Sequence, residues 1–380
     1  MKIDSYEEHP SMLVIDGHAD TGQRFVDEGW NFSDPLDGGM LSLATARQGR
    51  LSAEFFAIWV EPTQWKNRYA YRTLSLIDGV LEQVRKHPME LRLCTSAQEI
   101  VVSHVEGRFG VLLGIEGGHS IENSMALLRM YYQLGVRYMT LTWANTNEWA
   151  DSSGDLRDPG IHHHQGLSSF GREVIQEMNR LGMMIDVSHV SDATLADVLQ
   201  ASRAPVIASH SSARALTATP RNLTDEQLRS IAEKDGLVMG NFYPAFIDDT
   251  WRLGWAAIRP ELQAAQAKLE AEYAAKGLPV PYTVSSKIDR EFASRLPRAP
   301  FTALIDHIDH IAQVAGIDHV GIGTDFDGIP SLPEGIDSAA DLPKVTYALR
   351  ERGYSTDALR KLLGGNLLRV FRSVEAAATR

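Results

Sequence analysis

The sequence predicts a (β/α)₈ barrel, in which eight parallel strands alternate with helices around a closed sheet. Apolar segments of strand length recur eight times along the 380 residues and alternate with segments of helical periodicity, and no internal repeat relates them. A doubly wound open sheet is the alternative, but it usually carries a glycine-rich nucleotide loop after its first strand, and Gly17-His18-Ala19 is not one. The predicted strands are residues 12–15, 52–60, 109–115, 136–142, 183–188, 205–209, 236–242 and 319–323.

The chain is long enough for about two or three ordinary domains, but one barrel can span roughly 250 to 400 residues. We therefore expect residues 1–380 to form a single barrel domain. Residues 248–300 interrupt the alternation between the seventh and eighth strands with an Ala/Gln/Lys/Glu-rich segment and a polar, proline-containing stretch. We expect a helical insertion there, serving either as a lid or as a contact between copies in a homo-oligomer.

Composition narrows the classes of partner and compartment. Apolar residues make up 44% of the chain and charged residues 23%, which is typical of globular proteins in water. The net charge of −12 and the lack of a Lys/Arg cluster argue against nucleic acid and membrane surfaces as partners. Cys94 is the only cysteine, so neither an internal disulfide nor a thiolate metal cluster can form. With no secretory signal and no long apolar run, the chain is expected to be cytoplasmic.

Two helix-start signals follow predicted strands. Asp192 comes after the fifth strand and is expected to cap the next helix. Thr224 and Gln227 have the spacing of a capping box.

Side chains with metal-binding chemistry gather at the ends of the predicted strands, where a barrel carries its functional groups. An isolated buried histidine is usually a packing residue, but packing does not account for three imidazoles and three carboxylates in these places. The six residues are His18, Asp20, Glu116, His189, His210 and Asp325.

Nitrogen and carboxylate ligands without sulfur favour Zn²⁺, with Mn²⁺, Co²⁺ and Fe²⁺ as competitors. Two ions that share a bridging carboxylate need about five protein ligands, and His18, Asp20, Glu116, His189 and His210 supply them. Many binuclear barrel hydrolases use an HxH motif on the first strand and a carbamylated lysine as the bridge. This chain has HxD and no lysine near a strand end, so we expect Glu116 to be the bridge.

Asp325 is left for proton transfer, because a carboxylate beside two cations can accept a proton and pass it to a leaving group. Asp327 alternates to the other side of the extended segment and is expected to structure its loop. His119 and the run 162–164 are expected to be structural or solvated histidines.

The motifs that carry these residues resemble the membrane (renal) dipeptidase family of zinc peptidases, in the form of a bacterial-type soluble member. The resemblance runs in order from about residue 12 to residue 372. The matching motifs are IDGHAD (15–20), GIEGGHSIEN (114–123), IDVSHVSD (185–192), ASHSSARAL (208–216), PRNLTDEQL (220–228), GIGTDFDG (321–328) and LGGNLLRVF (363–371).

The resemblance implies a (β/α)₈ barrel with two Zn²⁺ ions per chain. By this resemblance His18 and Asp20 bind one ion, His189 and His210 bind the other, and Glu116 bridges them. Asp325 matches the catalytic acid/base of the family.

Three further residues match substrate-binding positions. Arg221 matches an arginine that binds the substrate carboxylate, which a guanidinium can hold through two parallel hydrogen bonds, and Tyr243 resembles a second contact to that carboxylate. A surface salt bridge for Arg221 and simple packing for Tyr243 are the alternatives. Trp143 stands where the family usually has a substrate-contacting histidine, and an indole can donate one hydrogen bond but cannot carry charge.

We therefore expect a binuclear zinc hydrolase that cleaves the amide bond of small dipeptide-like substrates, including those with a D-amino acid at the C-terminal position. No acyl-enzyme is expected, because Ser209, Ser211 and Ser212 flank a metal ligand and lack a free histidine base. The alternatives are hydrolysis of a non-peptide amide or lactam at the same site, or a non-catalytic binding scaffold.

Overall fold

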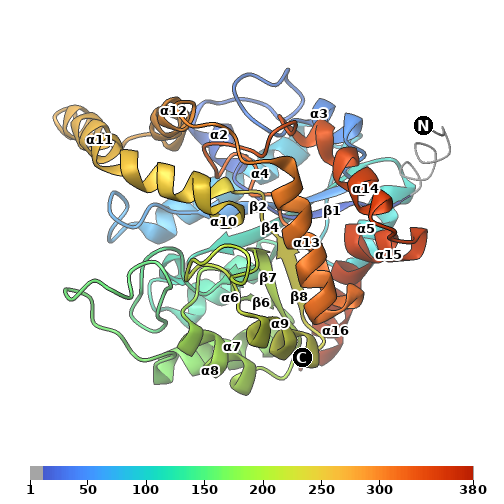
Figure 1. Ribbon diagram of the computed structural model, residues 1–380. Helices are drawn as coiled ribbons and strands as arrows, with labels where there is room; N and C mark the ends of the chain where they lie inside the picture. The colour runs from blue at the N-terminus through green and yellow to red at the C-terminus, as the bar shows by residue number, and fades with distance from the viewer. Residues whose placement is uncertain (1–11, 380) are drawn as a thin grey trace.

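The computed structural model describes residues 12–379, which form an eight-stranded parallel barrel surrounded by helices (Figure 1). Around the barrel the strands follow the order β1, β2, β4, β5, β6, β7, β8, β9, and a β9–β1 pairing closes the ring. This confirms the predicted barrel fold. The barrel strands are β1 (Ile15–Ala19), β2 (Ala53–Trp59), β4 (Phe109–Glu116), β5 (Val136–Thr140), β6 (Met184–Asp186), β7 (Val206–Ser211), β8 (Leu237–Gly240) and β9 (Val320–Ile322).

The first strand differs from its predicted position. β1 begins at Ile15 rather than at Met12 and continues through His18 to Ala19. The backbone after it is held by the loop beyond β9, because Asp325 N–H donates to the His18 carbonyl and Asp20 N–H donates to the Phe326 carbonyl. His18 therefore lies within the end of the strand, and Asp20 follows the strand directly.

A short strand, β3 (Leu91–Leu93), lies outside the ring and pairs with the beginning of β4. The sequence did not predict it, because three residues carry too little periodicity to identify a strand.

Helices follow most strands and pack around the barrel (Figure 1). Two short helices, α2 (Gly22–Asp27) and α3 (Leu43–Gln48), follow β1. The helices that follow β2 to β9 and lie outside residues 244–293 are α4 (Tyr69–Lys86), α5 (Ala97–Val105), α6 (Met125–Gln133), α7 (Ser169–Leu181), α8 (Asp192–Ala201), α9 (Asp225–Glu233), α13 (Phe301–Ala315), α14 (Leu342–Glu351), α15 (Thr356–Arg360) and α16 (Asn366–Ala377), with a π-helical turn at Lys361–Gly365.

The helix-start signals gave one correct and one wrong prediction. Thr224 and Gln227 form the expected capping box at the start of α9. The cap of α8 is Ser191, whose hydroxyl accepts a hydrogen bond from Thr194 N–H, so the prediction for Asp192 was wrong. Asp192 is instead the first residue of the helix, where its negative charge faces the positive end of the helix dipole.

Helix α16 covers the end of the barrel at which the strands begin. Its apolar residues Leu367, Phe371 and Val374 belong to one buried cluster with the first residues of several strands, among them Ile15 and Ala53. Since this end is filled with apolar side chains, the opposite end is left for polar groups.

Residues 244–293, between β8 and β9, form α10 (Pro244–Ile247), α11 (Asp249–Ala274) and α12 (Tyr282–Ala293). Helix α12 packs against α2 and α11, and the outer part of α11 extends away from the barrel (Figure 1). At the start of α12, Tyr282 donates its N–H to Asp27 and its hydroxyl to the carbonyl of Asp327. The first turn of α12 is therefore fixed at the rim of the barrel.

Two carboxyl groups are buried side by side on β1 and β2. Asp16 and Glu54 are paired in register and fully inaccessible to solvent. Burial raises the pKa of Asp16 to about 6, and burial together with the neighbouring Asp16 charge raises the pKa of Glu54 well above its ordinary value. The fold therefore favours the protonated form of Glu54, whereas the unfolded chain releases this proton near the ordinary pKa of a glutamate.

This predicts how the substitution Glu54→Gln changes stability. Above about pH 4.5 the folded protein binds one more proton than the unfolded chain at this position, so its stability falls as pH rises. Glutamine does not titrate, so it removes this pH dependence. The free energy of unfolding of the variant should equal that of the parent near pH 4 and exceed it at pH 8 by about 1 kcal/mol or more. Denaturant unfolding at both pH values, with metal content held equal, measures the difference.

Glu272→Gln, on the exposed surface of α11, is the control for losing one carboxyl group. A Glu54→Gln variant that is less stable than the parent at pH 8 would contradict this account.

Candidate metal centre

The predicted metal ligands meet at the end of the barrel where the strands finish. Glu116 is the last residue of β4, His18 lies near the end of β1 and His210 near the end of β7. His189 follows β6, and Asp20 follows β1. All but His189 are buried, and its side chain is 11% exposed.

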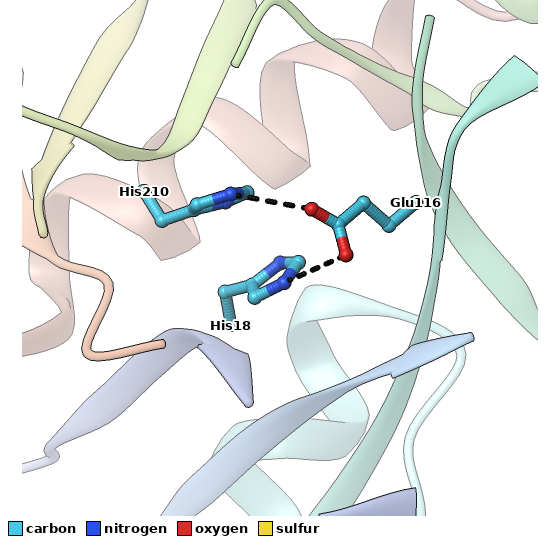
Figure 2. A group of neighbouring side chains, drawn as sticks. All are labelled: His18, Glu116 and His210. Carbon is cyan, nitrogen blue, oxygen red and sulfur yellow. Dashed lines mark ion pairs between the residues drawn. The ribbon is translucent and has the colours of Figure 1, made fainter. Parts of the chain in front are cut away.

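The carboxylate of Glu116 faces the imidazoles of His18 and His210, which come from different strands (Figure 2). Its Oε2 lies 3.5 Å from His18 Nε2. Its Oε1 lies 2.9 Å from His189 Nε2 and 3.5 Å from His210 Nε2. The two oxygens of this carboxylate thus face different imidazoles, of which those of His18 and His210 lie 3.8 Å apart between ring centres.

His18 is oriented by Tyr138 on β5. The Tyr138 hydroxyl lies 2.8 Å from His18 Nδ1, and this contact turns Nε2 toward Glu116 and toward Asp20 Oδ2, 3.6 Å away. Gly114 on β4 makes the arrangement possible, because a Cβ there would overlap the ring of Tyr138. Outer hydrogen bonds of this kind fix the orientation of histidine ligands in metal sites.

His210 is oriented by a comparable chain of hydrogen bonds. Its Nδ1 lies 2.7 Å from the hydroxyl of Ser209, which in turn donates to the carboxylate of Asp186 at 2.6 Å. Ser209 therefore accepts from Nδ1–H, which leaves the Nε2 lone pair directed at the centre.

Two of the central residues have strained backbones. His189 and Asp325 adopt positive φ angles of 68° and 63°, a region that non-glycine residues enter at a cost. At Gly328 a Cβ would collide with the carboxylates of both Asp20 and Asp325, so the chain approaches them closely there.

Burial and neighbouring charges shift the titration of these groups. Burial raises the pKa of Asp20 to about 7, and it lowers the pKa of His189 to about 4 with the help of the Arg221 charge. Burial also opposes charge on Glu116, but the charge and hydrogen bond of His18 outweigh it and hold the pKa of Glu116 well below its ordinary value. Neutral imidazoles and ionised carboxylates are the forms that bind metal ions.

The unsatisfied atoms fit a cation site. Among residues 12–379, His18 Nε2 and Asp20 Oδ1 are buried without a hydrogen-bond partner. One ligand atom each from His18, Glu116 and His210 lie within 4.8 Å of one another, and the same holds for His18, Asp20 and Asp325. Buried carboxylates without cationic partners would be costly, so these residues form a candidate metal site.

Asp325 and Arg221 border this centre. Asp325 Oδ2 accepts a hydrogen bond of 3.1 Å from Asn241 Nδ2, and burial raises the pKa of Asp325 above its ordinary value. Arg221 donates to the Ser211 hydroxyl and to the His210 carbonyl, both at 2.7 Å, and its buried Nε has no partner among the described residues. The structure therefore places the guanidinium against the strand that carries His210.

The two predicted aromatic contacts lie in different surroundings. The Trp143 ring is 6.5 Å from that of His189 and 4.8 Å from that of Trp59. Tyr243 packs against the rings of Phe246 and Trp251, and the guanidinium of Arg221 lies over the Phe246 ring.

Sequence patterns alone do not identify Tyr138, Asn241, Trp59 or Tyr282 as site residues. Tyr138 and Trp59 lie inside apolar segments that the sequence predicts only as strands. Asn241 stands at the end of the seventh predicted strand, two residues before Tyr243. Its position at a strand end could therefore have identified it as a candidate site residue. Tyr282 belongs to a helix whose position depends entirely on tertiary packing.

Other polar residues at this end have structural contacts. Asp327 accepts hydrogen bonds from the Thr21 hydroxyl and the Met40 N–H, as expected for a residue that orders its loop. His119 Nε2 bonds the Val60 carbonyl at 2.8 Å. In the run 162–164, His163 lies 3.9 Å from Asp151.

A parallel barrel with buried histidines and carboxylates at its C-terminal end defines a class of proteins, the barrel enzymes that work with metal ions. Comparison with known sequences is consistent with this class. The family described as "Membrane dipeptidase (Peptidase family M19)" matches residues 7–380, and the chain belongs to this family.

Individual relatives agree with the family. Dipeptidase 3 of Rattus norvegicus is 35% identical over 338 residues, 89% of this chain, and the match spans 59% of that longer protein. The crystal structure of the probable dipeptidase PvdM from Pseudomonas aeruginosa has a TM-score of 0.81 at 28% identity, covering 99% of this chain and 98% of that one.

A metallopeptidase from Rhodobacter sphaeroides, crystallised with a phosphinate mimic of the dipeptide L-Ala-D-Ala, has a TM-score of 0.75 at 26% identity. The match covers 96% of this chain and 99% of that one. Within residues 12–379, no helix has both the length and the apolar character needed to cross a membrane.

The orientation of His18 by Tyr138 can be tested with Tyr138→Phe. Removing the hydroxyl leaves His18 Nδ1 without its partner, so metal affinity should fall about 10-fold or more while the fold is retained. Competition with a chelator of known affinity measures the change. Tyr131→Phe is the matched control, because it removes another buried hydroxyl, which bonds the Ser120 carbonyl at 3.0 Å. Equal affinities for the two variants would show that Tyr138 does not support the site.

Proposed function

We propose that this protein is a binuclear zinc dipeptidase in which Glu116 bridges the two ions. The observation that carries this proposal is the position of the Glu116 carboxylate, with one oxygen facing His18 and the other facing His189 and His210. In this assignment Asp20 completes the ligands of the His18 ion. Nitrogen and oxygen ligands without sulfur suit Zn²⁺, with Mn²⁺, Co²⁺ and Fe²⁺ as chemically acceptable substitutes.

The substrate would be anchored by its C-terminal carboxylate at Arg221. Two N–H groups of this guanidinium are engaged by Ser211 and His210, while Nε remains without a partner in the described chain. A guanidinium held in this way can offer its remaining donors to a carboxylate in a fixed orientation. Tyr243 is proposed as a second contact to the same group. The dipeptide mimic bound to the Rhodobacter sphaeroides relative supports a substrate of this size, including one with a D-residue at its C-terminal position.

When bound, the two ions would supply an activated water and polarise the scissile carbonyl. Asp325 is proposed as the group that accepts a proton and delivers it to the departing nitrogen. Asn241 positions it by donating a hydrogen bond to Oδ2, which leaves Oδ1 for the reacting atoms. Burial raises the pKa of Asp325 above its ordinary value, toward the range in which one group can both accept and release a proton.

Serine nucleophiles are not needed in this mechanism. The Ser209 hydroxyl is buried between His210 and Asp186, and Ser211 accepts a hydrogen bond from Arg221. Both hydroxyls therefore support other residues, and the water is the nucleophile.

One observation leaves room for a second substrate class at the same site. Trp143 stands where the family usually has a substrate-contacting histidine, so the contacts to the substrate differ here, and a non-peptide amide or a lactam is the alternative substrate. A panel of L,L- and L,D-dipeptides, N-acylated amides and lactams separates the two. Hydrolysis of the N-acylated amides or lactams alone would favour the second substrate class. Binding of these compounds without turnover of any of them would favour a non-catalytic scaffold.

Asp325→Asn tests the proposed proton transfer. The amide keeps the shape and the contact with Asn241 but cannot accept a proton, so dipeptide turnover should fall about 100-fold or more while the metal content stays equal to that of the parent. Steady-state kinetics and elemental analysis on the same sample measure both. Asp357→Asn removes an exposed carboxyl on α15 and should leave turnover at the parental rate. Parental turnover in Asp325→Asn would exclude Asp325 as the acid/base.

A further inference from the structure

Three aromatic side chains from separate parts of the chain meet beside the metal centre. Trp59 is the last residue of β2 and is paired in register with Glu116 on β4, so both side chains leave the sheet at the same level. The Trp59 ring lies 4.8 Å from that of Trp143, beyond β5, and 5.6 Å from that of Tyr282, at the start of α12. We call these three residues the aromatic wall.

The aromatic wall borders the candidate metal ligands directly. Trp143 approaches His189 at 6.5 Å between ring centres, and Tyr282 donates its hydroxyl to the backbone of Asp327 in the loop that carries Asp325. Trp59 and Trp143 are both only partly buried, so part of each residue remains accessible to solvent. The Trp59 Nε1 is buried without a hydrogen-bond partner in residues 12–379.

The barrel places Trp59, the first residue of the aromatic wall, opposite the strand that holds Arg221. Arg221 is bonded to His210 and Ser211 on β7. In the closed ring, β2 and β7 are separated by three strands in either direction, so Trp59 lies diametrically across from the strand that holds the guanidinium. The Glu116 centre lies between them.

From this placement we propose that the aromatic wall is the pocket for the side chain of the N-terminal residue of the substrate, and that it selects aromatic or large apolar side chains. This inference rests on the proposed dipeptidase function. With the C-terminal carboxylate at Arg221 and the scissile carbonyl at the metal centre, the N-terminal residue extends toward β2 and β5. Aromatic rings favour stacked or edge-to-face partners, and the three wall side chains carry no charge to balance a charged side chain.

Helix α12 contributes to this selection. Tyr282 is part of residues 248–300, and its hydrogen bonds to Asp27 and Asp327 hold it against Trp59. The segment that interrupts the barrel pattern thus supplies one side of the substrate pocket.

The test compares two dipeptides that differ only in the N-terminal residue, Phe-Gly and Ala-Gly. For the parent protein, kcat/KM should be about 10-fold or more higher for Phe-Gly, since a large apolar group gains at least this factor in a matching pocket. In Trp143→Ala and, separately, in Trp59→Leu, this ratio should fall toward one. We compare the ratio because a defect in folding or in metal binding lowers kcat/KM for both dipeptides together and leaves their ratio unchanged.

Controls separate this inference from the proposed function. Trp143→Phe keeps an aromatic face and should retain most of the preference, and Trp30→Leu, beside Phe25 on α2, should leave the ratio unchanged. Hydrolysis of both dipeptides with a ratio near one in the parent, or an unchanged ratio in both wall variants, would overturn the inference and leave the dipeptidase proposal standing. Failure to hydrolyse any dipeptide would overturn the proposed function and this inference with it.

Discussion

The arrangement of the barrel end depends on one buried carboxylate that faces histidines from opposite sides of the ring. Glu116 is 4% exposed, and no lysine or arginine forms an ion pair with it in residues 12–379. Burying a carboxylate without compensation is expensive, and the three imidazoles around Glu116 compensate it only in part. Positive charge bound between these side chains would satisfy Glu116, Asp20 and the unpartnered Nε2 of His18 together.

The rest of the fold holds these groups in place. Tyr138 and Ser209 orient His18 and His210 from behind, so both Nε2 atoms point to the centre. Positive φ angles at His189 and Asp325 are maintained by the surrounding barrel, which fits the general tendency of backbone strain to gather at functional sites. The opposite end, closed by α16, provides the rigid apolar base from which the strands extend.

Much of the fold could be predicted because buried parallel strands are apolar runs and the site residues stand at their ends. His18, Glu116 and His210 were found in this way, and the structure brings them together. Trp59 could not be found, because an aromatic residue at the end of an apolar run looks the same whether it packs in the core or faces a substrate.

The missed features share a physical reason. Tyr138 supports His18 only because Gly114 on the neighbouring strand leaves space for its ring, a relation between residues distant in sequence. The position of Tyr282 likewise depends on how α12 docks on the barrel rim. Local signals also compete, as where Ser191 rather than Asp192 caps α8.

The most direct test of the central claim is a crystal structure of the zinc-loaded protein with anomalous diffraction measured at the zinc edge. The account predicts two peaks about 3.5–4 Å apart, one bonded to His18 and the other to His189 and His210, with one oxygen of Glu116 on each. A single peak at full zinc loading, or two peaks of which only one is bonded to Glu116, would contradict it.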